Sequence, residues 1–335
     1  MDGGLVRVHD LAGRPRGLGV VADHDGTVLT SHETVDGLPR IVLRTATGDR
    51  SCVVTADAVT PLPERNLALV RTEGLGVDPV PLTTRERVET GAYVRIVAGC
   101  RREARVLGAT EVTYTATDRV HRFGDVLELA IGTAGRDALR LGGGAAGGPV
   151  LDITTGAVVA VVGTALRSGQ RDSGFAMSLR PAADGPLAGL LARNAATVPA
   201  YGADLNLAGV LELTATSLGQ DGPPGVPDGC PGPAGVEPVE RRATVRDLAA
   251  FAHGPAPVLA LVGPPGSGRT TQLAALAARR GGGAEPAPTL WLRGADLHGD
   301  DTSLADAARR ALDRAARIVS AAGPGPAPLA GLTPG

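Results

Sequence analysis

Residues 142–152 read GGGAAGGPVLD, a run of glycine and alanine that ends in a proline and an apolar strand. Glycine adopts backbone angles that other residues avoid, so this run can turn sharply. A sharp turn of this kind can direct two N–H groups at one point, where they stabilise a negatively charged oxygen. No other stretch limits the fold of the chain as strongly.

The loop resembles the nucleophile loop of the trypsin superfamily of serine proteases, which reads G-x-S-G-G-P before an apolar strand. The corresponding residues here are Gly144, Ala145, Ala146, Gly147, Gly148 and Pro149. The resemblance places Gly144 in the oxyanion loop and Ala146 at the position of the serine. A methyl group cannot act as a nucleophile, and no Ser, Thr or Cys lies within two residues of Ala146.

Two further segments resemble the other corners of the protease triad. His32, in TVLTSHETV, follows an apolar strand as the general base of the family does, and ERNLALVRT resembles the segment that supplies the buried acid, here replaced by Asn66. An amide cannot stabilise an imidazolium as a carboxylate does, a change that costs about four orders of magnitude in rate. Loss of the nucleophile costs about six, and losses within one triad overlap. We therefore expect His32, Asn66 and Ala146 to form a degenerate triad without useful protease activity.

From Leu5 to about Leu179 the sequence consists of short apolar runs separated by glycine, aspartate and proline, which predicts antiparallel strands in a sandwich or barrel. The strand candidates are GLGVVAD, TVLTSHE, PRIVLRT, SCVVTADAV, LALVRT, AYVRIVAG, VLELAIG, PVLDI, AVVAVVGTAL and GFAMSL. This number fits two six-stranded barrels with a few strands missed. The fold class we expect is an all-β, trypsin-like double barrel followed by a partial α/β P-loop domain.

Two segments extend the resemblance to about residue 190. GAVVAVVGTAL, at 156–166, resembles the strand that pairs with an extended substrate in bacterial trypsin-like proteases, and GFAM, at 174–177, resembles their closing strand. A peptide or protein partner could add to the edge of such a strand in the barrel groove by backbone hydrogen bonds. A plain core strand is the alternative interpretation.

Beyond the barrel, PLAGLLARN predicts a short helix and LAGVLELTAT reads as a strand, before a stretch rich in proline and glycine from Gly219 to Pro238. Such a composition is typical of a linker. We divide the chain into a protease-like domain at 1–200, a linker at 201–240, a P-loop domain at 241–322 and a low-complexity tail, expected to be disordered, at 323–335.

The second domain begins with a helix, TVRDLAAFAHG, followed by a buried strand at Val258–Val262, a glycine-rich loop and an amphipathic helix. This order resembles a P-loop, in which backbone N–H groups and a helix N-terminus hold phosphates. The predicted nucleotide-binding residues are Gly263, Gly266, Ser267, Gly268, Arg269, Thr270 and Thr271. Thr270 would bind magnesium, so ATP or another nucleoside triphosphate with magnesium is the expected cofactor. Arg269 replaces the usual lysine, a change that favours binding over hydrolysis.

TLWLRG, from Thr289, predicts a second strand, and a helix capped near Asp301 or Thr302 follows. An ATPase also needs an acidic residue at the end of a later apolar strand, and we find no such strand; Asp296, Asp300 and Asp301 read as loop and capping residues. This half resembles the first βαβα portion of a STAND-class signalling ATPase. We expect the rest to be truncated or supplied elsewhere, and the lone portion to be weakened by open sheet edges.

Three functions stay open. The first is a sensor in which the inactive protease fold binds a peptide or partner and the nucleotide domain switches state. The second is a slow magnesium-dependent nucleoside triphosphatase with the barrel as scaffold. The third is a serine-type endopeptidase that uses another nucleophile.

Charge and composition argue against other classes. The net charge of -2 gives no general electrostatic reason to expect nucleic acid or an anionic membrane as a partner. The N-terminus lacks a basic segment followed by an apolar one, and no apolar run approaches the roughly 18 residues of a membrane helix, so we expect a cytoplasmic protein. Cys52, Cys100 and Cys230 are odd in number and lack CxxC spacing, which argues against a disulfide framework or a zinc site.

Overall fold

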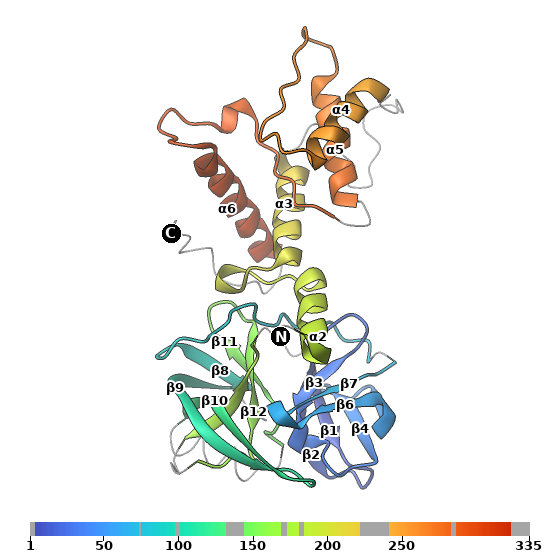
Figure 1. Ribbon diagram of the computed structural model, residues 1–335, viewed down its shortest axis with the longest axis vertical. Coiled ribbons are helices and arrows are strands. Elements are labelled where there is room, and N and C mark those ends of the chain that lie inside the picture. Colours follow the sequence, from blue (N-terminus) through green and yellow to red (C-terminus); the bar gives the residue numbers. More distant parts are fainter. Residues whose placement is uncertain are drawn as a thin grey trace. The chain divides into compact units, whose positions relative to one another are not determined.

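A computed structural model of the chain (Figure 1) divides into two compact units, Met1–Gly209 and Val210–Gly335. The structure describes residues 4–73, 75–97, 101–131, 144–168, 173–180, 184–221, 241–282 and 286–322. Cys100, Cys230, residues 222–240 of the predicted linker and the predicted tail lie outside these residues. Within them, no helix combines the length and the apolar character needed to cross a membrane.

The first unit begins with a seven-stranded antiparallel sheet in the order β5-β4-β1-β2-β3-β7-β6. Its strands are β1 (Leu5–His9), β2 (Pro15–Val21), β3 (Val28–Ser31), β4 (Arg40–Thr45), β5 (Ser51–Thr55), β6 (Val59–Leu62) and β7 (Leu67–Val70). Short 3-10 turns connect them at η1 (His32–Thr34), η2 (Ala56–Ala58) and η3 (Pro63–Arg65). In β1 the side chains of Val6 and Val8 are buried while Arg7 is exposed, because alternate residues of a strand point to opposite faces.

The second half of this unit is a closed six-stranded barrel in the order β10-β13-β12-β11-β8-β9. Its strands are β8 (Tyr93–Val97), β9 (Arg101–Thr115), β10 (Val120–Ala130), β11 (Pro149–Asp152), β12 (Val158–Gly163) and β13 (Gly174–Ser178). Every residue of β12 is buried, since the strand pairs with β11 on one side and β13 on the other. An uninterrupted apolar sequence suits that position.

The predicted double barrel is confirmed in its second half and differs in its first. The first sheet has seven strands rather than six, and within the described residues its end strands β5 and β6 do not pair. The apolar-run pattern missed β1, β6 and β9. In the 15-residue β9 the exposed Glu103 and Arg105 alternate with the buried Ala104 and Val106, so the strand offers no continuous apolar run.

Helix α2 (Gly185–Thr197) confirms the helix predicted at PLAGLLARN, with Leu187 and Leu190 buried. The next segment corrects a prediction: LAGVLELTAT belongs to helix α3 (Leu207–Asp221), after a 3-10 turn η4 (Gly202–Asp204). The side chain of Asn206 accepts a hydrogen bond from the N–H of Gly209 at 2.9 Å, which caps the first turn of the helix. The predicted linker at 201–240 therefore contains helix through Asp221, and residues 222–240 lie outside the described part.

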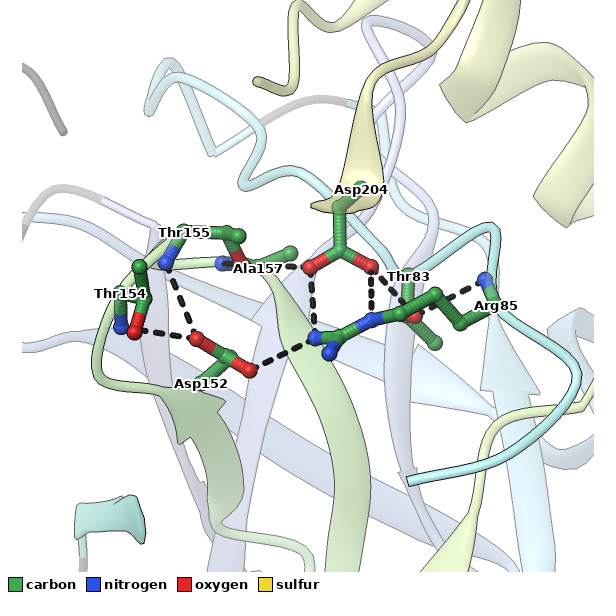
Figure 2. A network of polar contacts seen from close by, with 7 residues as sticks. All are labelled: Thr83, Arg85, Asp152, Thr154, Thr155, Ala157 and Asp204. Carbon is green, nitrogen blue, oxygen red and sulfur yellow. Dashed lines mark hydrogen bonds and ion pairs between the residues drawn. The ribbon is translucent and has the colours of Figure 1, made fainter. Parts of the chain in front are cut away.

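A buried ion-pair network fastens the turn η4 to the barrel (Figure 2). Arg85 donates from Nε and Nη2 to the two carboxylate oxygens of Asp204, at 2.9 and 2.8 Å, and from Nη2 to Asp152 at 2.7 Å. The hydroxyls of Thr83 and Thr155 also donate to Asp204, whose side chain is 0% exposed. Burial raises the pKa of Asp152, but hydrogen bonds from Arg85 and from the N–H groups of Thr155 and Thr154 outweigh it and hold that pKa below its usual range.

We predict that Asp204→Ala destabilises the first unit by about 1–3 kcal/mol, because it leaves two buried hydroxyls without their acceptor and the partly buried Arg85 with Asp152 as its remaining partner. Urea unfolding followed by tyrosine absorbance measures this, since all three tyrosines lie in the first unit and the single tryptophan, Trp291, lies in the second. The control is Asp125→Ala, which removes an exposed ion pair with Arg180 and should change stability little. Equal effects of the two substitutions would contradict the role assigned to the network.

The described part of the second unit is helical. Its elements after α3 are α4 (Arg242–His253), α5 (Arg269–Gly282), η5 (Gly294–Asp296) and α6 (Leu304–Ala322). These confirm the helices predicted around the glycine-rich loop and after the second strand candidate. The carboxylate of Asp306 accepts from the N–H groups of Thr302 and Ser303 at 3.0 and 3.1 Å, so α6 starts beyond both predicted capping residues.

The two predicted strands of the second unit are not formed. Within 241–282 and 286–322 the structure has no β-strand, and Val258 and Val262 are 78% and 93% exposed. TLWLRG ends in the turn η5 instead of a sheet. Two short parallel strands are marginal without further strands beside them, so these apolar segments carry strand sequence without a sheet to join. The predicted α/β P-loop domain is therefore not present as such.

Candidate functional site

The loop predicted to carry the nucleophile lies between the two sheets of the first unit. Ala146 is buried, and its carbonyl accepts a hydrogen bond from the N–H of Leu18 in β2 at 2.7 Å. The N–H of Gly147 donates to the carbonyl of Val162 in β12 at 2.8 Å. Both contacts are hydrogen bonds between main-chain groups, which every residue except proline can make. The position of the loop therefore depends on how closely its backbone can approach those of β2 and β12.

Gly147 makes that close approach possible. Its φ is 75°, and a Cβ atom there would lie 2.1 Å from the carbonyl oxygen of Leu18 and 2.2 Å from the hydroxyl of Thr30. Both the backbone angle and the space therefore require glycine. Gly142 and Gly143 lie outside the described residues. The N–H groups of Gly144 and Ala146 donate no hydrogen bond to any described residue, which leaves them available to an acceptor.

His32, in the turn after β3, lies beside this loop. Its backbone N–H donates to the carbonyl of Asn66 at 3.1 Å, and its neighbour Ser31 lies against Gly147. The structure therefore places His32 against Asn66, and the neighbouring Ser31 against Gly147, the residue after Ala146. The side chain of His32 is buried, and burial lowers its pKa below the ordinary value. The imidazole is accordingly neutral at pH 7.

Asn66 does not orient the imidazole. Its side chain is completely buried, and neither its carbonyl nor its amide nitrogen has a hydrogen-bond partner among the described residues. Its backbone adopts the left-handed conformation, with φ 45° and ψ 39°, which asparagine tolerates better than most residues. Asn66 thus contributes its backbone carbonyl to the site and leaves its side chain unused.

The hydrogen-bond partner of the His32 imidazole is the hydroxyl of Tyr114 and not a carboxylate. This hydroxyl lies 2.8 Å from Nδ1 of His32, and the two rings meet edge to face with centroids 5.8 Å apart. Burial and the negative charges of Asp36 and Glu33 raise the pKa of Tyr114, so its hydroxyl stays protonated. No local pattern points to Tyr114, because it lies 82 positions from His32 on a strand that the apolar pattern missed.

Strand β12 has no free edge for a peptide. It pairs with β11 at Val158, Ala160 and Val161, and with β13 from Ala160 to Gly163. Within the predicted segment at 156–166, the residues of β12 are therefore paired inside the barrel. Open positions begin only where the pairing ends, beyond Gly163.

The glycine-rich loop of the second unit has part of the predicted geometry. Gly266 and Gly268 have φ of 78° and 76°, and helix α5 begins at Arg269, so the turn into the helix is formed. The side chains of Arg269, Thr270 and Thr271 are exposed. Gly263 lies close to Ser267, whose buried hydroxyl has no partner among the described residues. The strand that should precede this loop is absent from the described part, as stated above.

Residues 17–161 match the family model described as Trypsin-like peptidase domain. The predicted resemblance to a trypsin-like peptidase domain is thereby confirmed for these residues, while the resemblance of the second unit to a STAND-class ATPase stays a prediction.

Solved structures similar to the chain are bacterial proteases. The active form of the Rv3671c protease from Mycobacterium tuberculosis is 23% identical, with 61% of this chain and 86% of that chain covered and a TM-score of 0.43. The MamO protease domain from Magnetospirillum magneticum is 18% identical, with coverages of 53% and 92% and a TM-score of 0.40. The serine endoprotease from Yersinia pestis is 15% identical, with coverages of 53% and 59% and a TM-score of 0.39. No curated protein matches the chain in sequence.

We predict that His32 makes the first unit less stable in acid. Because the pKa of His32 is lowered in the folded state, the unfolded chain binds a proton first as the pH falls below about 6.5. The stability that the neutral imidazole supports is complete above that pH and is lost on acidification, by at most about 1.4 kcal/mol per pH unit. Urea unfolding between pH 7.5 and 5 should show a shallower pH dependence for His32→Gln. Identical slopes in the two proteins would refute this prediction.

Proposed function

We propose that the trypsin-like domain binds an extended peptide or protein segment without cleaving it. The observation that carries the proposal is the nucleophile loop: its backbone is held in a fixed conformation by Gly147, with the N–H groups of Gly144 and Ala146 available, while a methyl group stands at the reacting position. Such a pocket can accept a carbonyl oxygen. It offers nothing that attacks the carbonyl carbon.

The surroundings of Ala146 favour binding over hydrolysis by another nucleophile. Thr30 has the hydroxyl nearest to the loop glycine Gly147, but it is completely buried and donates to the carbonyl of Leu18 at 2.5 Å. The family to which this domain belongs is described as a peptidase family, so an endopeptidase is the competing function. That function requires a nucleophile activated by His32, whose Nδ1 contacts Tyr114 and not an acid.

The test incubates the full chain, immobilised, with a random library of extended octapeptides and identifies retained peptides and shortened products by mass spectrometry. We expect retention without shortened products. Ala146→Leu adds a side chain at the centre of the pocket and should weaken retention about tenfold or more, equivalent to about 1.4 kcal/mol. Ala130→Leu, at an exposed position of β10, is the matched control and should retain the same peptides as the unaltered chain.

Two results would contradict the proposal. Shortened products that disappear in a His32→Ala variant would establish an endopeptidase. Retention that is equal in the unaltered chain and in Ala146→Leu would show that the peptides bind elsewhere.

As a second function, we propose that the glycine-rich loop of the second unit binds a nucleoside triphosphate with magnesium. The left-handed backbone of Gly266 and Gly268, directly before the first residue of α5, supports this, because such a turn directs successive N–H groups towards an anion. Thr270 would bind the magnesium ion. A sensor that links peptide binding to nucleotide binding follows if both functions hold, and a slow triphosphatase is the alternative if turnover is found.

Calorimetry of the full chain with ATP tests this function. We expect binding that strengthens with magnesium, a magnesium effect that is lost in Thr270→Ala, and no binding by Gly268→Asp, which places a negative charge and a side chain at a φ of 76°. The control is Ala278→Asp, which adds the same charge at an exposed position of helix α5, away from the loop. Binding that survives Gly268→Asp as well as it survives Ala278→Asp would exclude this loop as the site.

A further inference from the structure

Glu33, the residue after His32, makes an unusual contact with the barrel. Its carboxylate accepts a hydrogen bond from the N–H of Thr164 at 2.6 Å and another from the N–H of Ala165. The hydroxyls of Ser31 and Thr164 lie at 3.5 Å from the same carboxylate. One side chain from the turn η1 therefore accepts hydrogen bonds from two consecutive backbone N–H groups of the barrel half.

These two donors follow strand β12 directly, in a bend of the chain. Up to Gly163 the strand is paired on its flanks, and from Arg167 the chain pairs again, with Thr113 on β9. Thr164 and Ala165 lie between these paired segments, and Thr164 is exposed. They are thus backbone donors beside His32 that a ligand from solvent could reach, once Glu33 releases them.

Hydrogen bonds, without an ion pair, hold the Glu33 carboxylate in this position. Among the described residues no arginine or histidine forms an ion pair with its carboxylate, and burial raises its pKa above the ordinary value despite the hydrogen bonds that oppose the shift. A carboxylate held without a counter-charge in a site that disfavours its ionised form is costly to keep there. Hydration after release offsets the lost hydrogen bonds, so a competing acceptor can displace it.

We propose that Glu33 is an internal competitor that closes the peptide site: its carboxylate occupies the N–H groups of Thr164 and Ala165, to which a carbonyl oxygen of a bound peptide would otherwise bind. The inference rests on the proposed peptide-binding function and adds its regulation. A peptide that binds displaces Glu33 into solvent and supplies a carbonyl oxygen in place of its carboxylate. The affinity of the site for a peptide is accordingly set by the difference between the binding free energies of the peptide carbonyl and the Glu33 carboxylate at these N–H groups.

The contact itself is tested by backbone amide hydrogen exchange in the full chain. In Glu33→Ala and Glu33→Gln we expect exchange at Thr164 and Ala165 to accelerate about tenfold or more, as the loss of a charged acceptor predicts. Val162, whose N–H donates to Gly148, should keep its protection and so reports that the barrel stays folded. Glu111→Gln, an exposed glutamate of β9, is the matched control. Unchanged exchange at Thr164 and Ala165 would overturn the inference.

The competition is tested with the octapeptide library described above. We expect Glu33→Gln and Glu33→Ala to retain peptides about tenfold more tightly than the unaltered chain. Equal retention by variants and unaltered chain overturns the competition while leaving the peptide-binding function intact. Retention by none of these proteins overturns the peptide-binding function and the competition with it, whatever the exchange experiment shows of the contact.

Discussion

The close approach of two backbones at Gly17 and Gly147 determines the geometry of the first unit. A Cβ atom on Gly17 would lie 2.3 Å from the carbonyl oxygen of Ala146, and one on Gly147 would lie 2.1 Å from that of Leu18. The loop and strand β2 are therefore in contact through their main chains, with no side chain between them. Any larger residue at either position would separate the first sheet from the barrel and open the site.

Side chains complete the junction that these glycines allow. Glu33 reaches from the first sheet to the end of β12, and His32 reaches Tyr114 on β9. Both contacts start from the same turn, η1, and end on different strands of the barrel. The polar groups at the junction thus connect the two sheets. These connections need neither the nucleophile nor the acid of an active protease.

The sequence predicted those features that short segments encode. Ala146 and Asn66 could be assigned because each lies in a local motif, and His32 because it follows its strand directly. Tyr114, Glu33 and Asp204 could not, since their partners lie 82, 131 and 119 positions away and no local pattern specifies such pairings. The helix α3 was mistaken for a strand because its leucines and valine alternate briefly, and because the local capping signal of Asn206, which accepts from the N–H of Gly209, was overlooked. In the second unit, the apolar segment at Val258–Val262 predicts a strand correctly only where neighbouring strands exist to pair with it.

The replaced triad positions keep their backbone roles and lose their side-chain roles. The backbone carbonyl of Asn66 still accepts a hydrogen bond from the N–H of His32, and that of Ala146 still accepts from the N–H of Leu18, while neither side chain makes a polar contact. A completely buried amide without partners lowers stability, because its desolvation is not compensated. Asparagine nevertheless suits the left-handed backbone at this position, so the conformation that holds His32 beside the loop persists. The N–H groups of Gly144 and Ala146 meanwhile have no acceptor among the described residues, which is the physical basis for proposing a site that binds without cleaving.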